Sequence, residues 1–190
     1  MANSTQLFGF RAVGSANGGP YNGATLRVQV PTTASEGPLF IGDVVTLIGG
    51  ASTDGYPTVK EAAVTELPFG VIASFDANPD NLSLPYRAAS TQRYARVVPV
   101  EGNFFEARFN GSALSTANVG QTTIYAVGAG STVLGTSTTA LSATDVGTSV
   151  ADECRIVAYK NAPDNDITLA NAVAIVKFNL DALGINTVGV

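Results

Sequence analysis

Apolar and polar side chains alternate with a period of two along much of this chain. In residues 24–30, the apolar side chains of Leu26, Val28 and Val30 are separated by polar ones. Successive side chains of a β-strand point to opposite faces of the sheet. The alternation therefore predicts a strand with one buried and one exposed face.

Similar apolar segments recur at short spacing, separated by Gly, Pro, Asn and Asp. Strands are predicted at residues 24–30, 40–48, 58–64, 69–75, 94–100, 104–109, 122–127, 154–159 and 172–178. Helical periodicity is nearly absent, and only residues 112–119 and 142–146 suggest a helical turn. Many short strands joined by turn residues predict an all-β fold, a single β-barrel or β-sandwich domain.

The two ends of the chain differ from its middle. Residues 1–23 carry a single charge, Arg11, and several glycines, which favours an extended N-terminal arm over a long regular element. Residues 179–190 are also poor in charge but contain apolar side chains, which predicts a short C-terminal tail that docks onto its own chain or a partner. Residues 24–178 form the predicted β-rich body.

A stretch rich in Gly, Ser, Thr and Ala covers residues 128–149, with Asp145 as its single charge. Flexible linkers can have this composition. Thr and Val favour strands, however, and disordered chains usually carry more charge. We therefore predict surface hairpins here and no domain boundary.

Charge is scarce for a chain of 190 residues. Charged residues make up 13% of the sequence, against a typical value of about 25%, whereas hydrophobic residues make up an ordinary 45%. A free monomer usually covers its surface with charged side chains. The composition thus indicates a protein that keeps part of its surface against neighbours, and its net charge of -5 argues against nucleic-acid binding.

Histidine is absent and Cys154 is the single cysteine. This excludes Ser-His-Asp and Cys-His catalysis, histidine-ligated zinc or haem, and an intrachain disulfide. Cys154 has no imidazole to activate it, so we interpret it as a buried structural thiol. No cofactor is expected.

No targeting segment is recognisable. Residues 1–10 have neither a basic start nor an apolar run, which argues against a signal peptide. The apolar stretch at residues 38–50 is interrupted by Asp43 and is too short to span a bilayer. We expect synthesis in the cytoplasm and no contact with a membrane.

Two motifs suggest ligand binding, and both have simpler explanations. The Gly-rich residues 128–132 lack the lysine and the following helix of a phosphate-binding loop, so a β-turn is the better interpretation. Asp76 and Asp80 are spaced as in a calcium loop, but Arg87 stands where such a loop has Glu. At Asp76 and Asp80, and at Asp164 and Asp166, a calcium site and ordinary Asx turns are two alternative interpretations.

Paired carboxylates could support glycoside hydrolysis without histidine. The candidate pairs are Glu101 with Glu106 and Glu61 with Glu66. Enzymes of this kind bind sugars on aromatic platforms, and this chain has no Trp and only 8% aromatic residues. We interpret these acids as surface charges and expect no enzymatic activity.

Positive charge is concentrated in one region, where tyrosines are interleaved with Arg87, Arg93, Arg96 and Arg108. Arg and Tyr together can form a single-stranded nucleic-acid platform. They are also the residue types that anchor protein interfaces. Because the whole chain is acidic, we favour the interface.

Several short motifs, in a fixed order, resemble tailed-bacteriophage virion structural proteins described as capsid decoration (cement) proteins. They begin with Gly9-Phe10-Arg11-Ala12-Val13 and Asn17-Gly18-Gly19-Pro20 and continue with Phe40-Ile41-Gly42-Asp43-Val44-Val45. Further motifs are Tyr86-Arg87-Ala88-Ala89-Ser90-Thr91, Phe105-Glu106, Arg155-Ile156-Val157 and Pro163-Asp164-Asn165. The resemblance extends from about residue 9 to residue 179.

The resemblance implies a β-rich protein without catalysis that binds the exterior of a phage capsid. It would bridge major capsid protein subunits as a homo-oligomer, with a trimer favoured over a dimer. The residues predicted to contact capsid or oligomer are Phe8, Phe10, Arg11, Asn17, Pro20, Tyr21, Arg87, Arg93 and Tyr94. The alternative is a β module of the tail or fibre that binds carbohydrate for host attachment.

Overall fold

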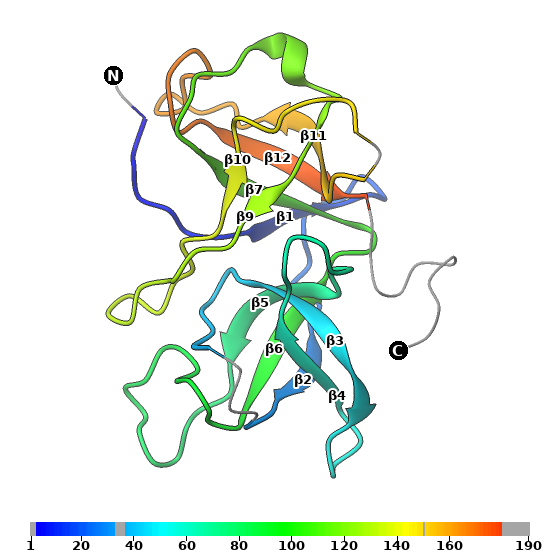
Figure 1. Cartoon of the computed structure of the whole chain (residues 1–190), viewed down its shortest axis with the longest axis vertical. Coiled ribbons are helices and arrows are strands. Elements are labelled where there is room, and N and C mark those ends of the chain that lie inside the picture. The colour runs from blue at the N-terminus through cyan, green and yellow to red at the C-terminus, as the bar shows by residue number, and fades with distance from the viewer. Residues whose placement is uncertain (1–2, 33–36, 150, 180–190) are drawn as a thin grey trace.

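The computed structural model describes residues 3–32, 37–149 and 151–179. The predicted all-β class is confirmed, because strands form every regular element except a single 3₁₀ turn, η1 (Thr116–Asn118). The strands form two barrel-like bodies stacked along the long axis of the molecule (Figure 1). The fold thus differs from a single barrel or sandwich, because each set of strands curls around apolar side chains of its own.

The lower body in Figure 1 is a closed barrel with the strand order β2-β4-β3-β5-β6. Neighbouring strands are antiparallel except for β2 and β4, which are parallel. Alternate side chains such as Val28, Val30 and Val97 fill its interior. The strands are β2 (Leu26–Val30), β3 (Val44–Ala51), β4 (Pro57–Glu61), β5 (Gly70–Phe75) and β6 (Arg93–Pro99).

The upper body has the strand order β8-β11-β12-β7-β10-β9, with β1 also paired to β7. On one side β7 pairs with β12, while β1 and β10 share its other side. These strands are β1 (Arg11–Ser15), β7 (Asn103–Asn110), β8 (Thr122–Thr123), β9 (Tyr125–Ala126), β10 (Ala140–Ser142), β11 (Cys154–Tyr159) and β12 (Val173–Phe178).

The chain visits the upper body twice. It starts there with β1, forms the whole lower barrel with β2 to β6, and returns for β7 to β12. The lower barrel is therefore an insertion between two adjacent strands of the upper body. Residues of the predicted N-terminal arm are extended, but β1 lies in the sheet of its own chain, where it pairs with residues 103–106 of β7.

One buried apolar cluster spans the junction of the two barrels, beside a second cluster inside the lower barrel. The rings of Phe10, Tyr125 and Phe178 pack together, with centroids 5.9 Å apart for Phe10 and Tyr125 and 5.2 Å apart for Phe10 and Phe178. Val71 and Val98 of the lower barrel belong to the same buried cluster. This packing holds the two barrels in a defined orientation.

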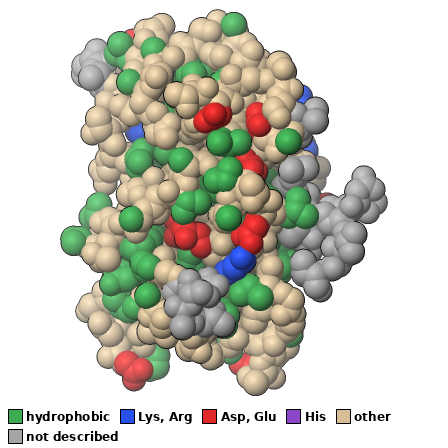
Figure 2. All heavy atoms as spheres, in the orientation of Figure 1, with side chains coloured by type: hydrophobic (Ala, Val, Ile, Leu, Met, Phe, Trp, Pro, Cys, Tyr) green, Lys and Arg blue, Asp and Glu red, His purple; other side chains and the backbone are tan. Residues whose placement is uncertain are grey.

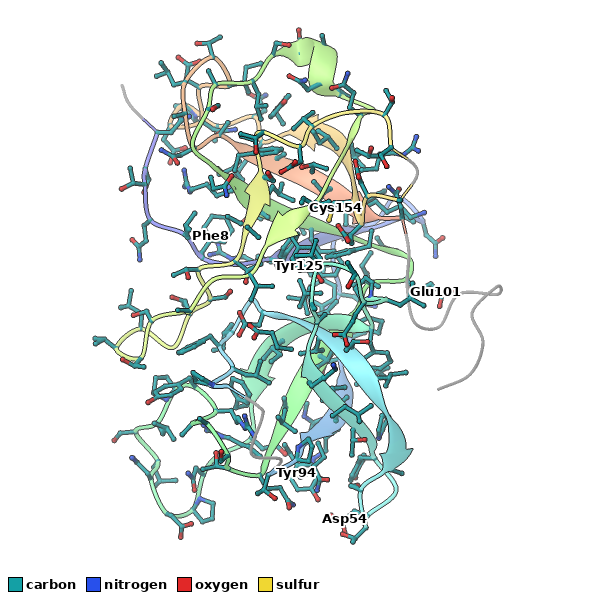
Figure 3. All side chains as sticks on the ribbon, in the orientation of Figure 1. Phe8, Asp54, Tyr94, Glu101, Tyr125 and Cys154 are labelled. Carbon is teal, nitrogen blue, oxygen red and sulfur yellow. The ribbon has the colours of Figure 1, made fainter. Side chains whose placement is uncertain are left out.

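A buried hydrogen bond strengthens the junction. The Tyr125 hydroxyl, buried between the barrels (Figure 3), donates to the carbonyl oxygens of Ala62 and Ala63 at 3.4 and 3.3 Å. Burial also raises the pKa of Tyr125 well above its ordinary value. The phenol therefore stays neutral and keeps its hydrogen at any physiological pH.

Most predicted strands are confirmed, with small changes at their ends. The segment 154–159 matches β11 residue for residue, and 122–127 is split into β8 and β9. The turn predicted at 112–119 contains η1, whereas the one predicted at 142–146 is wrong because Ser142 ends a strand. Of the predicted tail, residues 180–190 lie outside the described residues.

Candidate interaction surface

An open apolar pocket lies at the junction of the two barrels. It has a volume of about 190 Å³, and its walls include Phe8, Phe10, Tyr21, Ile41, Ile72 and Val98. Arg11 also lines it, with a side chain that is 62% exposed to solvent. Both barrels and the N-terminal segment contribute walls, so the pocket exists only because the three are packed together.

A second hollow of about 360 Å³ continues from this pocket along the N-terminal segment. Phe8, Arg11 and Thr136 line both spaces. The Phe8 ring lies between two guanidinium groups, 4.7 Å from that of Arg11 and 5.7 Å from that of Arg108. Cation–π contacts of this kind hold the aromatic side chain in place beside the pocket.

The positive charges beside this hollow are balanced by a buried carboxylate. Glu106, on β7, pairs with Arg11 at 3.3 Å and with Lys160 at 2.9 Å. Burial of an acid requires such partners, because an isolated charge inside a protein is costly. Glu106 is therefore held by ion pairs, and the proposed pairing of Glu106 with Glu101 for hydrolysis finds no support from its surroundings.

A loop at residues 128–138 reaches from the upper body to the lower barrel and clasps it; we call it the clasp loop. Its backbone bonds to the strand-like residue Ile41, whose amide donates to Gly135 at 2.9 Å and whose carbonyl accepts from Ser137 at 2.8 Å. In Figure 3, Phe8 lies where the N-terminal segment passes this loop. The clasp loop is one of the surface structures predicted for residues 128–149.

Glycines allow the clasp loop to approach so closely. A Cβ at Gly135 would lie 2.5 Å from Pro85, and one at Gly130 would overlap the ring of Phe40. Gly130 also has a φ of +67°, in a region that other residues rarely adopt. The Gly-rich motif thus serves close packing between the barrels.

The three most exposed large apolar side chains of the described residues lie on two loops that meet at Gly135 and Pro85. Val133 and Leu134, at the tip of the clasp loop, are 85% and 56% exposed, and Leu82, on the loop that contains Pro85, is 80% exposed. Figure 2 shows hydrophobic atoms along this edge of the molecule. The sequence reasoning missed these residues, although a Val-Leu pair within a run of Gly, Ser and Thr was a visible signal.

The predicted interface residues fall into separate places. Phe8, Arg11 and Tyr21 line the 190 Å³ pocket together with Phe10, but Phe10 is only 2% exposed and belongs to the apolar core, which corrects its prediction as an interface residue. Asn17 and Pro20 are exposed in the turn that follows β1. Arg87, Arg93 and Tyr94 belong to the lower barrel, and Figure 3 places Tyr94 beside Asp54 at its far end.

Arg87 is not an interface anchor, which corrects the sequence prediction. Its side chain is 0% exposed. The guanidinium donates to the carbonyl oxygens of Thr91 at 2.7 Å, Gly37 at 2.6 Å and Pro31 at 2.6 Å. Carbonyls from separate loops thus surround the charge, and Arg87 joins those loops together.

Arg93 and Tyr94 are also used inside their own barrel. The Arg93 guanidinium lies 5.1 Å from the ring centre of Phe75 and donates to the carbonyl oxygens of Asp76 and Tyr86. The Tyr94 ring is stacked by Arg27 at 4.2 Å, and its hydroxyl donates to Asp54. These contacts stabilise the barrel surface, and they do not support the predicted role of either residue as an anchor for a partner.

The candidate calcium positions are occupied by other contacts. Asp76 forms ion pairs with Arg27 at 2.8 Å and Arg96 at 3.4 Å. Asp166 accepts hydrogen bonds from the amide and hydroxyl of Thr168. Within residues 3–32, 37–149 and 151–179, no group of three or more acidic, Cys or His side chains could hold a metal ion.

A buried carboxylate lies under the clasp loop. Oδ2 of Asp43 accepts from the amide of Phe40 at 2.7 Å, whereas Oδ1 has no partner at hydrogen-bonding distance. Burial raises the pKa of Asp43 from 3.8 to about 6, and the nearby hydroxyls of Ser137 and Thr139 partly offset that rise. Asp43 is thus a proton-binding group at the point where the clasp loop meets the lower barrel.

The single cysteine, Cys154, is buried in the upper body. Burial raises the pKa of the Cys154 thiol, which keeps it protonated and unreactive. Within the part of the chain that the structure describes, no helix is long and apolar enough to cross a bilayer.

No protein-family model, curated protein or solved structure matches the chain, so the likeness to phage decoration proteins stays a prediction.

Proposed function

We propose that this protein is a capsid decoration (cement) protein of a tailed bacteriophage. It binds the exterior of the head as a homo-oligomer and bridges major capsid protein subunits. It performs no catalytic step and needs no cofactor, nucleic acid or membrane. Its contribution is mechanical, because a contact that spans a subunit boundary must break before the shell can open there.

The observation that carries this proposal is the exposure of Leu82, Val133 and Leu134 on two loops that meet at Gly135 and Pro85. Single exposed apolar side chains are common on soluble proteins, whereas several on adjoining loops favour contacts with other protein chains. The clasp loop connects the paired strands β9 and β10 of the upper body, and backbone hydrogen bonds fix it to Ile41 at the lower barrel before any partner binds. A preorganised surface loses little conformational entropy on binding.

The double-barrel architecture suits a bridging role. The shared core around Phe10 and Tyr125 joins the barrels into one rigid unit, so a load applied to one barrel is transmitted to the other. A homo-oligomer would present several such units to a symmetric shell. Modest contacts then combine through effective concentration.

The direct test is the composition of the virus particle. Virions of the phage that encodes this chain should contain it at a copy number comparable to that of the major capsid protein. Cryo-electron microscopy of the same particles should place it on the outer surface of the head. A minority copy number on tails or fibres would favour the host-attachment alternative, and absence from the particle would contradict both.

Leu82 offers a test at residue level. Leu82→Asp should reduce occupancy on heads that lack the protein, without changing the circular dichroism spectrum. Val119→Asp is the matched control, because Val119 is also an exposed apolar loop residue but follows η1 at the other end of the molecule. Equal occupancy of both variants would remove Leu82 from the capsid contact.

A further inference from the structure

The tip of the clasp loop has the form of a rigid apolar knob. The amide of Ser131 donates to Thr136 at 2.8 Å, and the amide of Gly135 donates to Ser131 at 2.7 Å, so the turn is closed across its base. Val133 and Leu134 lie within this closed turn and are largely exposed. Its own backbone hydrogen bonds therefore fix the knob in a solvent-exposed position.

The junction pocket has the size and chemistry to receive such a knob. Its volume is about 190 Å³ and its walls are mostly apolar. An apolar cavity of about 150 Å³ stays dry and takes up a benzene-sized molecule. A leucine side chain therefore fits, and the exposed Arg11 can cover it with its aliphatic stem.

Knob and pocket lie next to each other on the same molecule. Thr136, two residues after Leu134, lines the pocket. The closed turn prevents the knob from folding back into its own pocket. When two copies face each other across a two-fold axis, however, each knob can enter the pocket of the other copy. Both knobs and both pockets are then buried.

We propose that the protein forms a two-fold homodimer in which Leu134 of each copy occupies the junction pocket of the other. This inference deepens the homo-oligomer of the proposed function by naming its contact and choosing the dimer. A capsid partner could cover the knob but would leave the pocket open. Only a second copy supplies a knob for every pocket.

The charge distribution also favours approach at this edge. The molecule has a net charge of -5, so two copies repel each other on average. Residues 128–144 contain no charged side chain. The clasp loop is therefore a surface through which two acidic copies can meet with little repulsion.

Cysteine cross-linking of the full chain tests the geometry. Ala73 lines the pocket and is exposed, and the native Cys154 is buried. A mixture of Leu134→Cys protein and Ala73→Cys protein should form a covalent heterodimer under mild oxidation. Leu134→Cys mixed with Val119→Cys is the matched control and should not cross-link. A heterodimer yield no greater than in this control would overturn the inference.

The double variant Leu134→Cys/Ala73→Cys separates a two-fold dimer from an open chain. Reciprocal exchange should give a product that stops at the dimer on a denaturing gel. A ladder of larger covalent oligomers would contradict the two-fold arrangement. The native Cys154 should not contribute, because its thiol is enclosed in the upper body.

The mass in solution provides an independent measurement. Light scattering should give the dimer mass for the native protein, and Leu134→Asp should weaken dimerisation by about ten-fold or more. Val119→Asp should leave it unchanged. A native protein that stays monomeric overturns the inference even if virions contain it, whereas a dimer absent from virions contradicts only the capsid function.

Discussion

The amide nitrogen of Phe10 lies 2.9 Å from the carbonyl oxygen of Gly42. This hydrogen bond joins the N-terminal segment to the chain that leads into β3 of the lower barrel. The backbones approach so closely that a Cβ at Gly42 would lie 2.6 Å from the carbonyl oxygen of Phe8. The contact fixes the N-terminal wall of the junction pocket.

Gly42→Ala should therefore destabilise the protein more than a glycine substitution in an open turn. Gly42 has a φ of +96°, and the new methyl group would also overlap Phe8, so we expect a loss of roughly 1–3 kcal/mol or more in the free energy of unfolding. Gly18→Ala is the control, because Gly18 has a φ of +85° but nothing within 4 Å of its Cβ position. Urea denaturation compares the two, and equal losses would contradict the close approach.

Phe10→Ala should cost roughly 3–5 kcal/mol of stability, because it leaves a cavity in the core shared by the two barrels. Phe10 is buried against Tyr125 and Phe178. Phe8→Ala is the matched change, since Phe8 is only half-buried beside the pocket and should cost clearly less. The midpoint of urea denaturation measures both. If Phe10→Ala cost as little stability as Phe8→Ala, the Phe10 ring would not be part of the core.

Deletion of the N-terminal segment would test the fold and not a surface contact. Removal of residues 1–20 would delete β1 and Phe10 and expose the backbone edge of β7. Any loss of binding by such a variant would therefore reflect a damaged fold and not a lost contact. The point substitutions at Leu82 and Leu134 avoid this ambiguity.

Arg87→Ala should be strongly destabilising. The change leaves the carbonyl groups of Pro31, Gly37 and Thr91 without their buried donor. Each hydrogen bond from the charged guanidinium contributes about 1.5–3 kcal/mol, so the total loss should be roughly 3 kcal/mol or more. Thermal unfolding measures the effect.

Two further variants separate geometry from charge at Arg87. Arg87→Lys keeps the charge but replaces the planar fork with a single ammonium, so it should recover only part of the loss. Arg96→Ala removes an exposed arginine that pairs with Asp76, and should change stability by no more than about 1 kcal/mol. If Arg87→Ala were as mild as Arg96→Ala, the enclosed guanidinium would not organise these loops.

Asp43 should make the protein less stable as the pH rises. Its pKa is about 6 in the folded state, against an ordinary value of 3.8 for an exposed aspartate, so the folded state binds the proton more tightly than the unfolded chain does. The resulting stabilisation is present below about pH 4 and is lost as the pH rises through about 6. The difference corresponds to about 3 kcal/mol.

The difference in unfolding free energy between the native protein and Asp43→Asn isolates this effect. Asn can still accept the hydrogen bond from the Phe40 amide but does not titrate. Relative to this variant, the native protein should lose stability between about pH 4 and pH 7. Parallel pH profiles for the two proteins would show that Asp43 titrates normally.

The sequence predicted strands correctly where a strand has one buried and one exposed face. Residues 154–159 alternate in this way, and β11 has the same bounds. β1 and β10 were missed because they are short and have little alternation; their pairing with β7 defines them as strands. Local pattern cannot report a partner that is distant along the chain.

The candidate site was legible only in part. Phe8, Phe10, Arg11 and Tyr21 were predicted as contact residues and do line a common pocket. Arg87 has the residue type of an interface anchor, but carbonyl groups from Pro31 and Gly37 enclose it. Pro31 is more than 50 residues away from Arg87 along the chain, so no local sequence motif predicts this contact.

The sequence alone determined the all-β class, because the period of two and the frequent turn residues leave few other ways to bury the apolar side chains. It also excluded histidine chemistry by composition. The tertiary structure decided that five strands close into a barrel while the others form a second, barrel-like sheet, that the N-terminal segment contributes a strand to that sheet, and that a pocket lies beside an exposed apolar tip. These features depend on contacts between distant segments, where shape and packing select the partners.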